Sequence, residues 1–132
     1  MCMVKFKMVP NESKYYRFIS DLRCDPRVQG GFIETVNKIS DEDQSIYMNS
    51  HGGEYFICLY DNKPIGFVGS VDGDIRICVL PEYQRMGVGK FMLKHIIKEF
   101  PESHAKIKID NEASQRMFED CKFLKKYYIY EY

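Results

Sequence analysis

The spacing of apolar residues changes several times along the chain, and each change predicts a switch between strand and helix. From Met3 to Met8 apolar and basic residues alternate, which predicts a first strand that Pro10 stops. Asn11 then stands as an N-cap before an apolar stripe at helical spacing, formed by Tyr15, Phe18, Ile19 and Leu22. We expect this helix to end near Asp25-Pro26, because the residue before a proline avoids the helical region.

The middle of the chain combines a second helical zone with a run of short strands. The helical zone covers Val28 to Asn49 and is broken around Ser40, which has capping-box spacing to Asp43. Three β-type runs follow, at Glu54 to Tyr60, Pro64 to Val71 and Asp74 to Leu80. Asp61-Asn62 and Asp72-Gly73 separate them, and since Asp-Gly is a strong hairpin signal we predict an antiparallel meander.

The last third of the chain returns to helical spacing before alternating again. A third helix carries an apolar stripe of Val88, Met92, Leu93, Ile96, Ile97 and Phe100, and Pro101 closes it. His104 to Asp110 alternates, Asn111 opens a fourth amphipathic helix, and Tyr127 to Tyr132 reads as a final Tyr-rich strand. The order β-α-α-β-β-β-α-β-α-β predicts an α+β fold with a mixed sheet.

Chain length and charge balance indicate a single globular domain and argue against a nucleic-acid-binding or membrane-spanning protein. At 132 residues, with 45% hydrophobic and 29% charged residues, the chain has the composition of a single globular domain over residues 1–132. Nineteen basic residues balance nineteen acidic ones, which argues against a dedicated nucleic-acid binder because such proteins carry a basic surplus. The longest apolar run, Tyr55 to Tyr60, is too short to cross a bilayer. We therefore expect a cytoplasmic protein with neither a nucleic-acid nor a membrane partner.

The cysteines and histidines lack the spacing of a metal site. The five cysteines are scattered without a CxxC pair, and His51, His95 and His104 form no cluster. We expect reduced, mostly buried thiols and no bound metal.

The segment from Val79 to Lys90 carries the main chemical signal, since it joins a strand end, a glycine-containing loop and a helix start. Glycine lets a ligand approach the backbone, and the unpaired N–H groups and dipole of a helix N-terminus attract a pyrophosphate. Arg85 and Lys90 add positive charge. The loop is neither a Walker A sequence nor a GxGxxG fingerprint in a βαβ unit, and such a loop can also simply cap a helix.

Two motifs resemble the GNAT superfamily of N-acetyltransferases. Gln84-Arg85-Met86-Gly87-Val88-Gly89 is similar to the family's Gln/Arg-x-x-Gly-x-Gly/Ala signature. Asn111-Glu112-Ala113-Ser114, followed by Phe118-Glu119 and Phe123, resembles its Asn-x-x-Ala/Ser…Tyr/Phe-Glu-Lys-x-Gly-Phe segment. The likeness covers nearly the whole chain, and it implies a mostly antiparallel sheet of about six strands with helices on both faces.

The resemblance also implies acetyl-CoA as co-substrate and a set of contacts for it. Its pyrophosphate would bind main-chain amides of Gln84, Arg85, Met86, Gly87, Val88, Gly89 and Lys90. Its pantetheine arm would lie in a wedge between the fourth and fifth strands, beside Ile77, Cys78 and Val79. Asn111 and Ser114 match positions that contact the pantetheine or its waters, and Phe118 would pack near the thioester.

The sequence departs from the family pattern near its end. Phe118 stands where many members have a tyrosine proposed as general acid, and a phenyl ring cannot donate a proton. Either another group acts, with Tyr128 as the candidate beside Tyr127 and Tyr130, or the CoA thiolate leaves unassisted. Lys122 replaces a common glycine, and only nine residues follow the last motif. The usual closing strand is then missing unless a neighbouring chain supplies it, which leaves a monomer and a homodimer open.

The general base has two candidates. Asp74 begins the fourth strand, near where family members often have an acidic residue that works through water, although it also suits a hairpin end. Glu82 is the second candidate. Cys78 lies on the same strand as Asp74, but no histidine is placed to activate it, so we expect a buried thiol rather than a nucleophile.

Together these features predict an N-acetyltransferase that moves the acetyl group of acetyl-CoA to a primary amine by direct attack in a ternary complex. The amine belongs to a small molecule, an amino-sugar or a peptide. The mixed charges of Arg23, Asp25 and Arg27 do not indicate which of these acceptor classes is correct. We expect the acceptor over Leu22 to Ile39 and at the C-terminal strand. The alternative is a non-catalytic GNAT-shaped module that holds CoA or an acyl-CoA.

Overall fold

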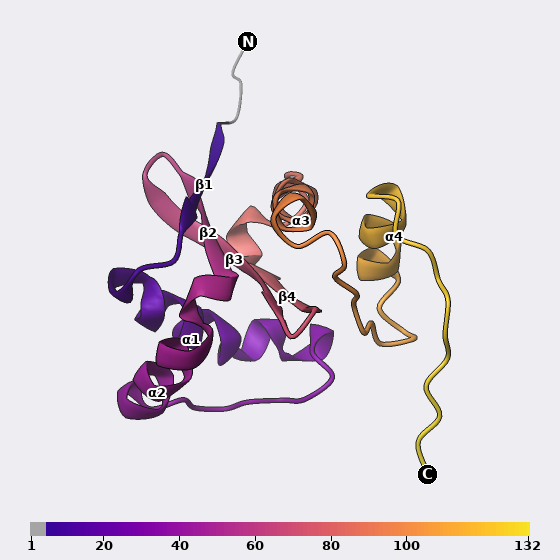
Figure 1. The fold of residues 1–132 in the computed structure, drawn as a ribbon, viewed down its shortest axis with the longest axis horizontal. Helices are drawn as coiled ribbons and strands as arrows, with labels where there is room; N and C mark the ends of the chain where they lie inside the picture. The colour runs from indigo at the N-terminus through magenta and orange to yellow at the C-terminus, as the bar shows by residue number, and fades with distance from the viewer. Residues whose placement is uncertain (1–4) are drawn as a thin grey trace.

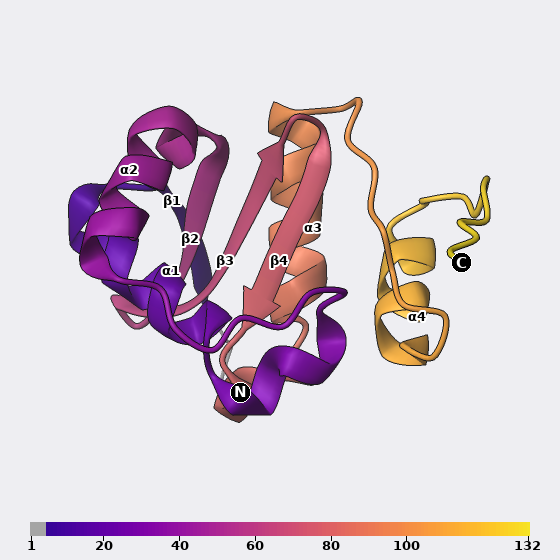
Figure 2. The same cartoon turned by 90° about the horizontal axis from the view of Figure 1, so that it is seen from below.

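A four-stranded antiparallel sheet forms the centre of the molecule, in a computed structural model that describes residues 5–132. Its strands lie in the order β1 (Phe6–Pro10), β2 (Tyr55–Tyr60), β3 (Lys63–Val71) and β4 (Asp74–Val79). Helices α1 (Tyr16–Arg23) and α2 (Asp41–His51) cover one face, and α3 (Val88–Glu99) covers the other. Helix α4 (Glu112–Asp120) packs beside α3, beyond the β4 edge of the sheet (Figures 1 and 2).

The predicted meander is confirmed, with tight turns at both places that the sequence indicates. Asp61 and Asn62 have φ angles of 53° and 65°, and Asp72 and Gly73 have φ angles of 52° and 83°. Left-handed conformations at both central residues match the twist of a two-residue hairpin. These turns place β4 at the edge of the sheet, paired with β3 on one side only.

Two predicted helix caps are confirmed and one is wrong. The Ser40 hydroxyl accepts from the Asp43 N–H at 3.1 Å, and the Asn111 side chain accepts from the Ser114 N–H at 3.1 Å. Asn11, however, does not cap α1, because a 3₁₀ turn (η1, Ser13–Tyr15) precedes the helix. Its side-chain amide instead donates to the carbonyl oxygen of Gly52 at 3.2 Å, which ties the end of β1 to the end of α2.

The predicted helical zone before Ser40 is wrong. A 3₁₀ segment, η2 (Pro26–Gly31), takes its place, and residues 32–40 are irregular. Two consecutive glycines end η2, and glycine disfavours helix. The Arg23 guanidinium then donates to the carbonyl oxygen of Glu34 at 2.6 Å, which holds the irregular segment against the end of α1.

The expectation of about six strands is also wrong, since the described residues form four. His104 makes one parallel bridge with Asp74, and the chain then leaves β4 without a ladder over residues 105–110. Residues 124–132 form no strand either, and their large side chains are exposed: Leu124, Tyr127, Tyr128, Ile129, Tyr130 and Tyr132. Alternation suits a strand, but a strand also needs main-chain pairing, and residues 105–110 leave the open edge of β4 after the single bridge at His104.

The first strand differs slightly from the prediction. Pro10 is its last residue, opposite Phe56, rather than a stop before it. Met3 lies outside the described residues, as does Val4. No helix within residues 5–132 is long and apolar enough to span a bilayer.

The sheet separates two hydrophobic clusters. Ile57, Phe67 and Cys78 belong to the cluster under α1 and α2, whereas Val68 and Met92 belong to the cluster under α3 and α4. Side chains alternate between the faces along each strand, so neighbouring residues of β4 contribute to opposite sides. The helices on both faces that the resemblance implies are therefore confirmed.

Candidate functional site

The loop between β4 and α3 presents a row of free main-chain donors. Arg85 and Gly87 have φ angles of 67° and 84°, and these two left-handed residues turn the chain into α3. Within the described chain, no acceptor is hydrogen-bonded to the N–H groups of residues 85–90, and the first paired amide is that of Phe91, which donates to Gly87 O at 3.0 Å. Unpaired donors at the N-terminus of a twelve-residue helix form a site that attracts anions.

The two glycines of this loop have different structural roles. A Cβ on Gly87 would meet nothing within 4 Å, so this position opens to solvent where an anion would approach the amides. A Cβ on Gly89 would lie 2.5 Å from the sulfur of Met117. Gly89 therefore leaves the space that the Met117 side chain fills where α4 packs on α3, a role that the motif alone did not reveal.

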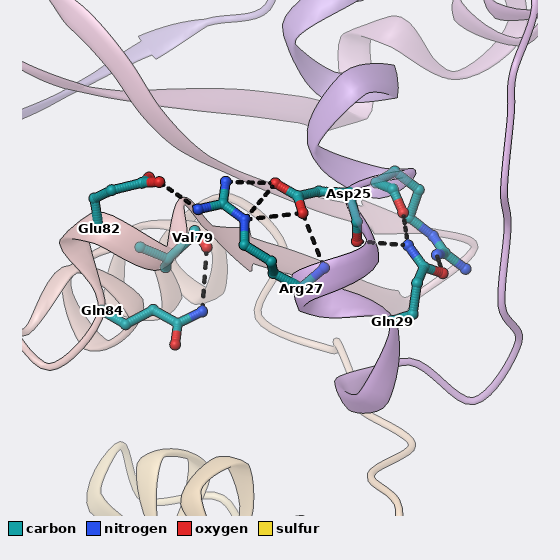
Figure 3. A network of polar contacts seen from close by, with 7 residues as sticks. Asp25, Arg27, Gln29, Val79, Glu82 and Gln84 are labelled. Atoms are coloured by element: carbon teal, nitrogen blue, oxygen red, sulfur yellow. Dashed lines mark hydrogen bonds and ion pairs between the residues drawn. The ribbon is translucent and has the colours of Figure 1, made fainter.

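Two of the predicted pyrophosphate contacts have other partners. The Gln84 N–H already donates to Pro81 O at 3.3 Å, and its side-chain amide donates to Val79 O at 3.4 Å (Figure 3). The Lys90 ammonium pairs with Asp120 at 2.7 Å, a hydrogen bond that raises the pKa of Lys90 and lowers that of Asp120. The charge of Lys90 thus serves the α3–α4 contact, and Lys90 leaves only its main-chain N–H at the loop.

The open edge of β4 offers main-chain groups at alternate residues. The Ile75 N–H donates outward to His104 O at 2.9 Å, whereas the Leu80 N–H donates to Ile65 O in the sheet at 2.8 Å. Main-chain groups alternate between the two edges of a strand, so those of Ile77 and Val79 face the open edge. The main chain of Cys78 faces β3 instead.

The Cys78 side chain is buried on the α1 face with 8% of its surface exposed. Burial raises the pKa of its thiol to about 12. A thiol that stays neutral at physiological pH is a poor nucleophile, which agrees with the expected structural role.

Beyond His104 the chain leaves β4 and runs to the start of α4, and the two segments diverge (Figure 2). Asn111 lies at the far side of this opening, where its side-chain oxygen caps α4 by accepting from the Ser114 N–H. A hollow of about 250 Å³ lies beside it, lined by Gly30, Gly31, Asp110 and Asn111. The structure thus places Asn111 and Ser114 across from η2.

The remaining candidates lie apart from one another. Phe118 is buried and packs edge-on against Phe123, with ring centres 5.0 Å apart. Asp74 lies at the other end of β4 from the glycine loop, with its carboxylate 3.3 Å from the Arg76 guanidinium. Tyr128 is 79% exposed, and it belongs to the C-terminal segment 124–132, which runs along the outer side of α4 (Figure 1).

A polar network that sequence reasoning missed connects η2 with η4 (Pro81–Tyr83), the turn that leads into the glycine loop. Asp25 binds the Arg27 guanidinium through two oxygens, at 3.1 and 2.7 Å, and the other end of that guanidinium binds Glu82 at 2.5 Å (Figure 3). Hydrogen bonds from Arg27 lower the pKa of both Asp25 and Glu82. The Asp25–Arg27 half is visible in the sequence, but Glu82 lies 55 residues from Arg27.

Glu82, the second candidate base, is thus engaged in an ion pair. A second hollow, of about 290 Å³, lies within and beside the predicted acceptor region. It is lined by Arg17, Ser20, Asp21, Cys24, Asn37, Lys38, Ile39, Ser40 and Asp41.

Comparisons with known proteins agree with this architecture. The model of the acetyltransferase (GNAT) family matches residues 15–123. Among solved structures, spermidine N-acetyltransferase from Vibrio cholerae, in complex with CoA and spermine, superposes with a TM-score of 0.77 at 17% identity, over 92% of this chain and 82% of that one.

Two further structures have the same fold. The protein yncA of Salmonella typhimurium, solved with its cofactor acetyl-CoA, has a TM-score of 0.72 at 16% identity over 89% of this chain and 78% of that one. The ribosomal-protein-S18-alanine N-acetyltransferase of Escherichia coli has a TM-score of 0.67 at 18% identity over 93% and 80%.

A search of curated protein sequences found no match. The family model nevertheless covers most of the chain, including the glycine loop and α4. Its match, the fold and the free amides of the loop support one conclusion: this chain belongs to the GNAT acetyltransferase family.

Proposed function

We propose that this protein is an acetyl-CoA-dependent N-acetyltransferase that acts on a primary amine. The observation that carries the proposal is the row of unpaired main-chain donors at residues 85–90. Successive amides at a helix N-terminus suit a pyrophosphate, and Gly87 leaves the approach to them open. CoA or acetyl-CoA is present in the structures of the V. cholerae and S. typhimurium relatives, which supports this ligand.

The open edge of β4 supports a position for the rest of the cofactor. From the glycine loop, the pantetheine arm would follow the edge from Val79 towards Ile77 and form main-chain hydrogen bonds as an added strand does. An N–H of this edge would then face the thioester carbonyl, where it stabilises the oxyanion that develops when the amine attacks. The arm laid in this direction points its thioester towards the end of β4 that carries Asp74.

Asp74 is the proposed base, acting directly or through water. An unperturbed amine has a pKa of about 10.4, so it must lose a proton before it attacks the thioester. The Arg76 guanidinium lies 3.3 Å from the Asp74 carboxylate and fixes one of its oxygens. Since Phe118 cannot act as an acid and Tyr128 lies in the outer C-terminal segment, we propose that the CoA thiolate leaves without a protein donor. The amine then attacks the thioester, and the CoA thiolate leaves, within one ternary complex of protein, acetyl-CoA and amine.

The decisive experiment compares two isosteric substitutions at Gly87. Asn and Asp have nearly the same shape, and both tolerate the left-handed conformation better than most residues, but only Asp places a negative charge beside the pyrophosphate. We expect Gly87→Asp to weaken acetyl-CoA binding by at least about tenfold relative to Gly87→Asn, measured by titration calorimetry. Equal affinities in the two variants would place the cofactor elsewhere.

A turnover assay then separates the enzyme from the non-catalytic alternative. Release of free CoA is followed with a panel of amines, beginning with spermine because a structural relative is bound to it. Thiol release that depends on a particular amine supports the transferase. Tight acetyl-CoA binding without turnover across the panel supports a CoA-binding module instead.

A further inference from the structure

The 3₁₀ segment η2 spans the two sides of the proposed cofactor opening. At its start, Arg27 binds Glu82, which belongs to the turn leading into the glycine loop. At its end, the Gly30 carbonyl accepts from the Lys108 ammonium at 3.3 Å, and a Cβ on Gly31 would lie 3.7 Å from the Asn111 amide nitrogen. Segment η2 therefore contacts the turn that follows β4 on one side and the segment that leads into α4 on the other.

The Arg27 guanidinium is held in a fixed orientation for its contact with Glu82. Asp25 binds its Nε and Nη2 groups in the two-pronged geometry that fits a carboxylate to an arginine, and it also accepts from the Arg27 N–H at 2.9 Å. The Nη1 group remains for Glu82. Asp25 thus orients Arg27, and Glu82 alone connects η2 with the cofactor loop through this network.

Gln29 connects η2 with the end of α1 and with the irregular segment that follows η2, on the side of the predicted acceptor region. Its side-chain oxygen accepts from the Val36 N–H at 2.9 Å and from the Arg23 guanidinium at 3.3 Å, and its side-chain nitrogen donates to the Asp25 carbonyl at 3.1 Å. The irregular segment that follows η2 is therefore hydrogen-bonded to it through Gln29. This segment includes Asn37 and Lys38, which line the larger hollow on the acceptor side.

We propose that Arg27 is a positioning residue that, through Glu82, couples occupancy of the cofactor loop to the order of η2 and of the acceptor-side segment. The proposal rests on the proposed function, because it takes acetyl-CoA as the ligand of residues 85–90. The Arg27–Glu82 pair is exposed, with 54% of each side chain accessible. Exposed ion pairs add little to global stability, so its removal should change local order and leave the fold intact.

Amide hydrogen exchange with and without acetyl-CoA tests the coupling without knowledge of the acceptor. The reporter amides are hydrogen-bonded ones: Val28 and Phe32 for η2, Val36 for the following segment, and Phe91 for the cofactor loop. In the wild-type protein, acetyl-CoA should slow exchange at Phe91 and, by about two- to fivefold, at the η2 reporters. In Glu82→Gln the slowing at Phe91 should remain and the slowing at η2 should disappear.

Two further variants sharpen the result. Arg27→Gln should behave as Glu82→Gln does, and the double variant should show no additional loss, because all three remove the same contact. Glu12→Gln is the matched control: it breaks an exposed ion pair with Lys14, and the coupling should persist.

The outcomes separate the two proposals. If acetyl-CoA produces no slowing at Phe91 in the wild-type protein, the proposed cofactor site fails. If Phe91 is slowed in both proteins and η2 is slowed equally in wild type and Glu82→Gln, the cofactor site stands and the role of Arg27 is overturned.

Discussion

At the scale of single residues, the C-terminal cap of α4 has regular geometry but carries a lysine at the position where glycine is usual. The Phe123 N–H donates to Phe118 O at 3.0 Å, the Lys122 N–H donates to Glu119 O at 2.9 Å, and the rings of Phe118 and Phe123 are in contact. This is a Schellman cap with its hydrophobic contact, and it needs a left-handed residue that is usually glycine. Lys122 occupies that position with a φ of 73°.

We expect Lys122→Gly to stabilise the protein by about 0.5–1 kcal/mol, because glycine adopts the left-handed conformation without strain. Thermal unfolding should show a midpoint a few degrees higher. Lys122→Ala is the matched control, since it removes the same side chain but keeps the Cβ. A gain in Lys122→Ala equal to that in Lys122→Gly would assign the effect to the side chain rather than to the backbone.

At the scale of elements, β4 is the strand that connects the glycine loop, where we propose that acetyl-CoA binds, with the proposed base. Its last residue leads into the turn before the loop, and its first residue is Asp74. We expect Asp74→Asn to lower the turnover number by about 100-fold, because the amine loses the group that removes its proton, while the dissociation constant for acetyl-CoA stays unchanged. Steady-state kinetics with an active amine and calorimetry measure the two quantities.

Asp72→Asn provides the control for this prediction. It removes a carboxylate two residues away, at a turn position with a φ of 52° where asparagine is tolerated. Its rate should equal that of the wild-type protein. Full activity of Asp74→Asn at every pH from about 6 to 9 would remove Asp74 from the mechanism.

Local rules predicted the elements, and long-range contacts explain where those rules failed. The hairpins at Asp61 and Asp72 follow from turn chemistry that a few neighbouring residues determine. The segment 105–110 alternates as a strand does, yet it does not pair with the open edge of β4, because its path towards α4 is determined by packing with residues distant in sequence.

The candidate site likewise has one part that local sequence predicts and another part that depends on long-range contacts. Its glycine loop was predicted because free amides at a helix start are a local property of the chain. The packing of Gly89 on Met117 and the Arg27–Glu82 pair join residues distant in sequence, and no local pattern reports them.

At the scale of the whole molecule, the sheet buries ionisable thiols that affect stability at high pH. Burial raises the pKa of Cys58 to about 11 and that of Cys78 to about 12. Between the ordinary thiol pKa of about 8.5 and these values, the unfolded chain releases protons that the folded protein retains. Stability is therefore full below pH of about 8.5 and falls as the pH rises, by up to about 1.4 kcal/mol per pH unit for each thiol.

Denaturant unfolding at a series of pH values measures this slope. The double variant Cys58→Ala and Cys78→Ala should be less stable at neutral pH, because it leaves cavities in the core, but its stability should fall less steeply between pH of about 9 and 11. An unchanged slope in the double variant would show that other groups titrate there.

The division of the apolar interior into two clusters has a consequence for how such a protein diversifies. Helices α1 and α2, beside the proposed acceptor region, pack on one cluster, and α3, which begins at the glycine loop, packs on the other. Substitutions in separate clusters combine almost additively when they share no partners. The α1–α2 face can therefore be rebuilt for a different amine while the α3 face keeps the proposed acetyl-CoA site.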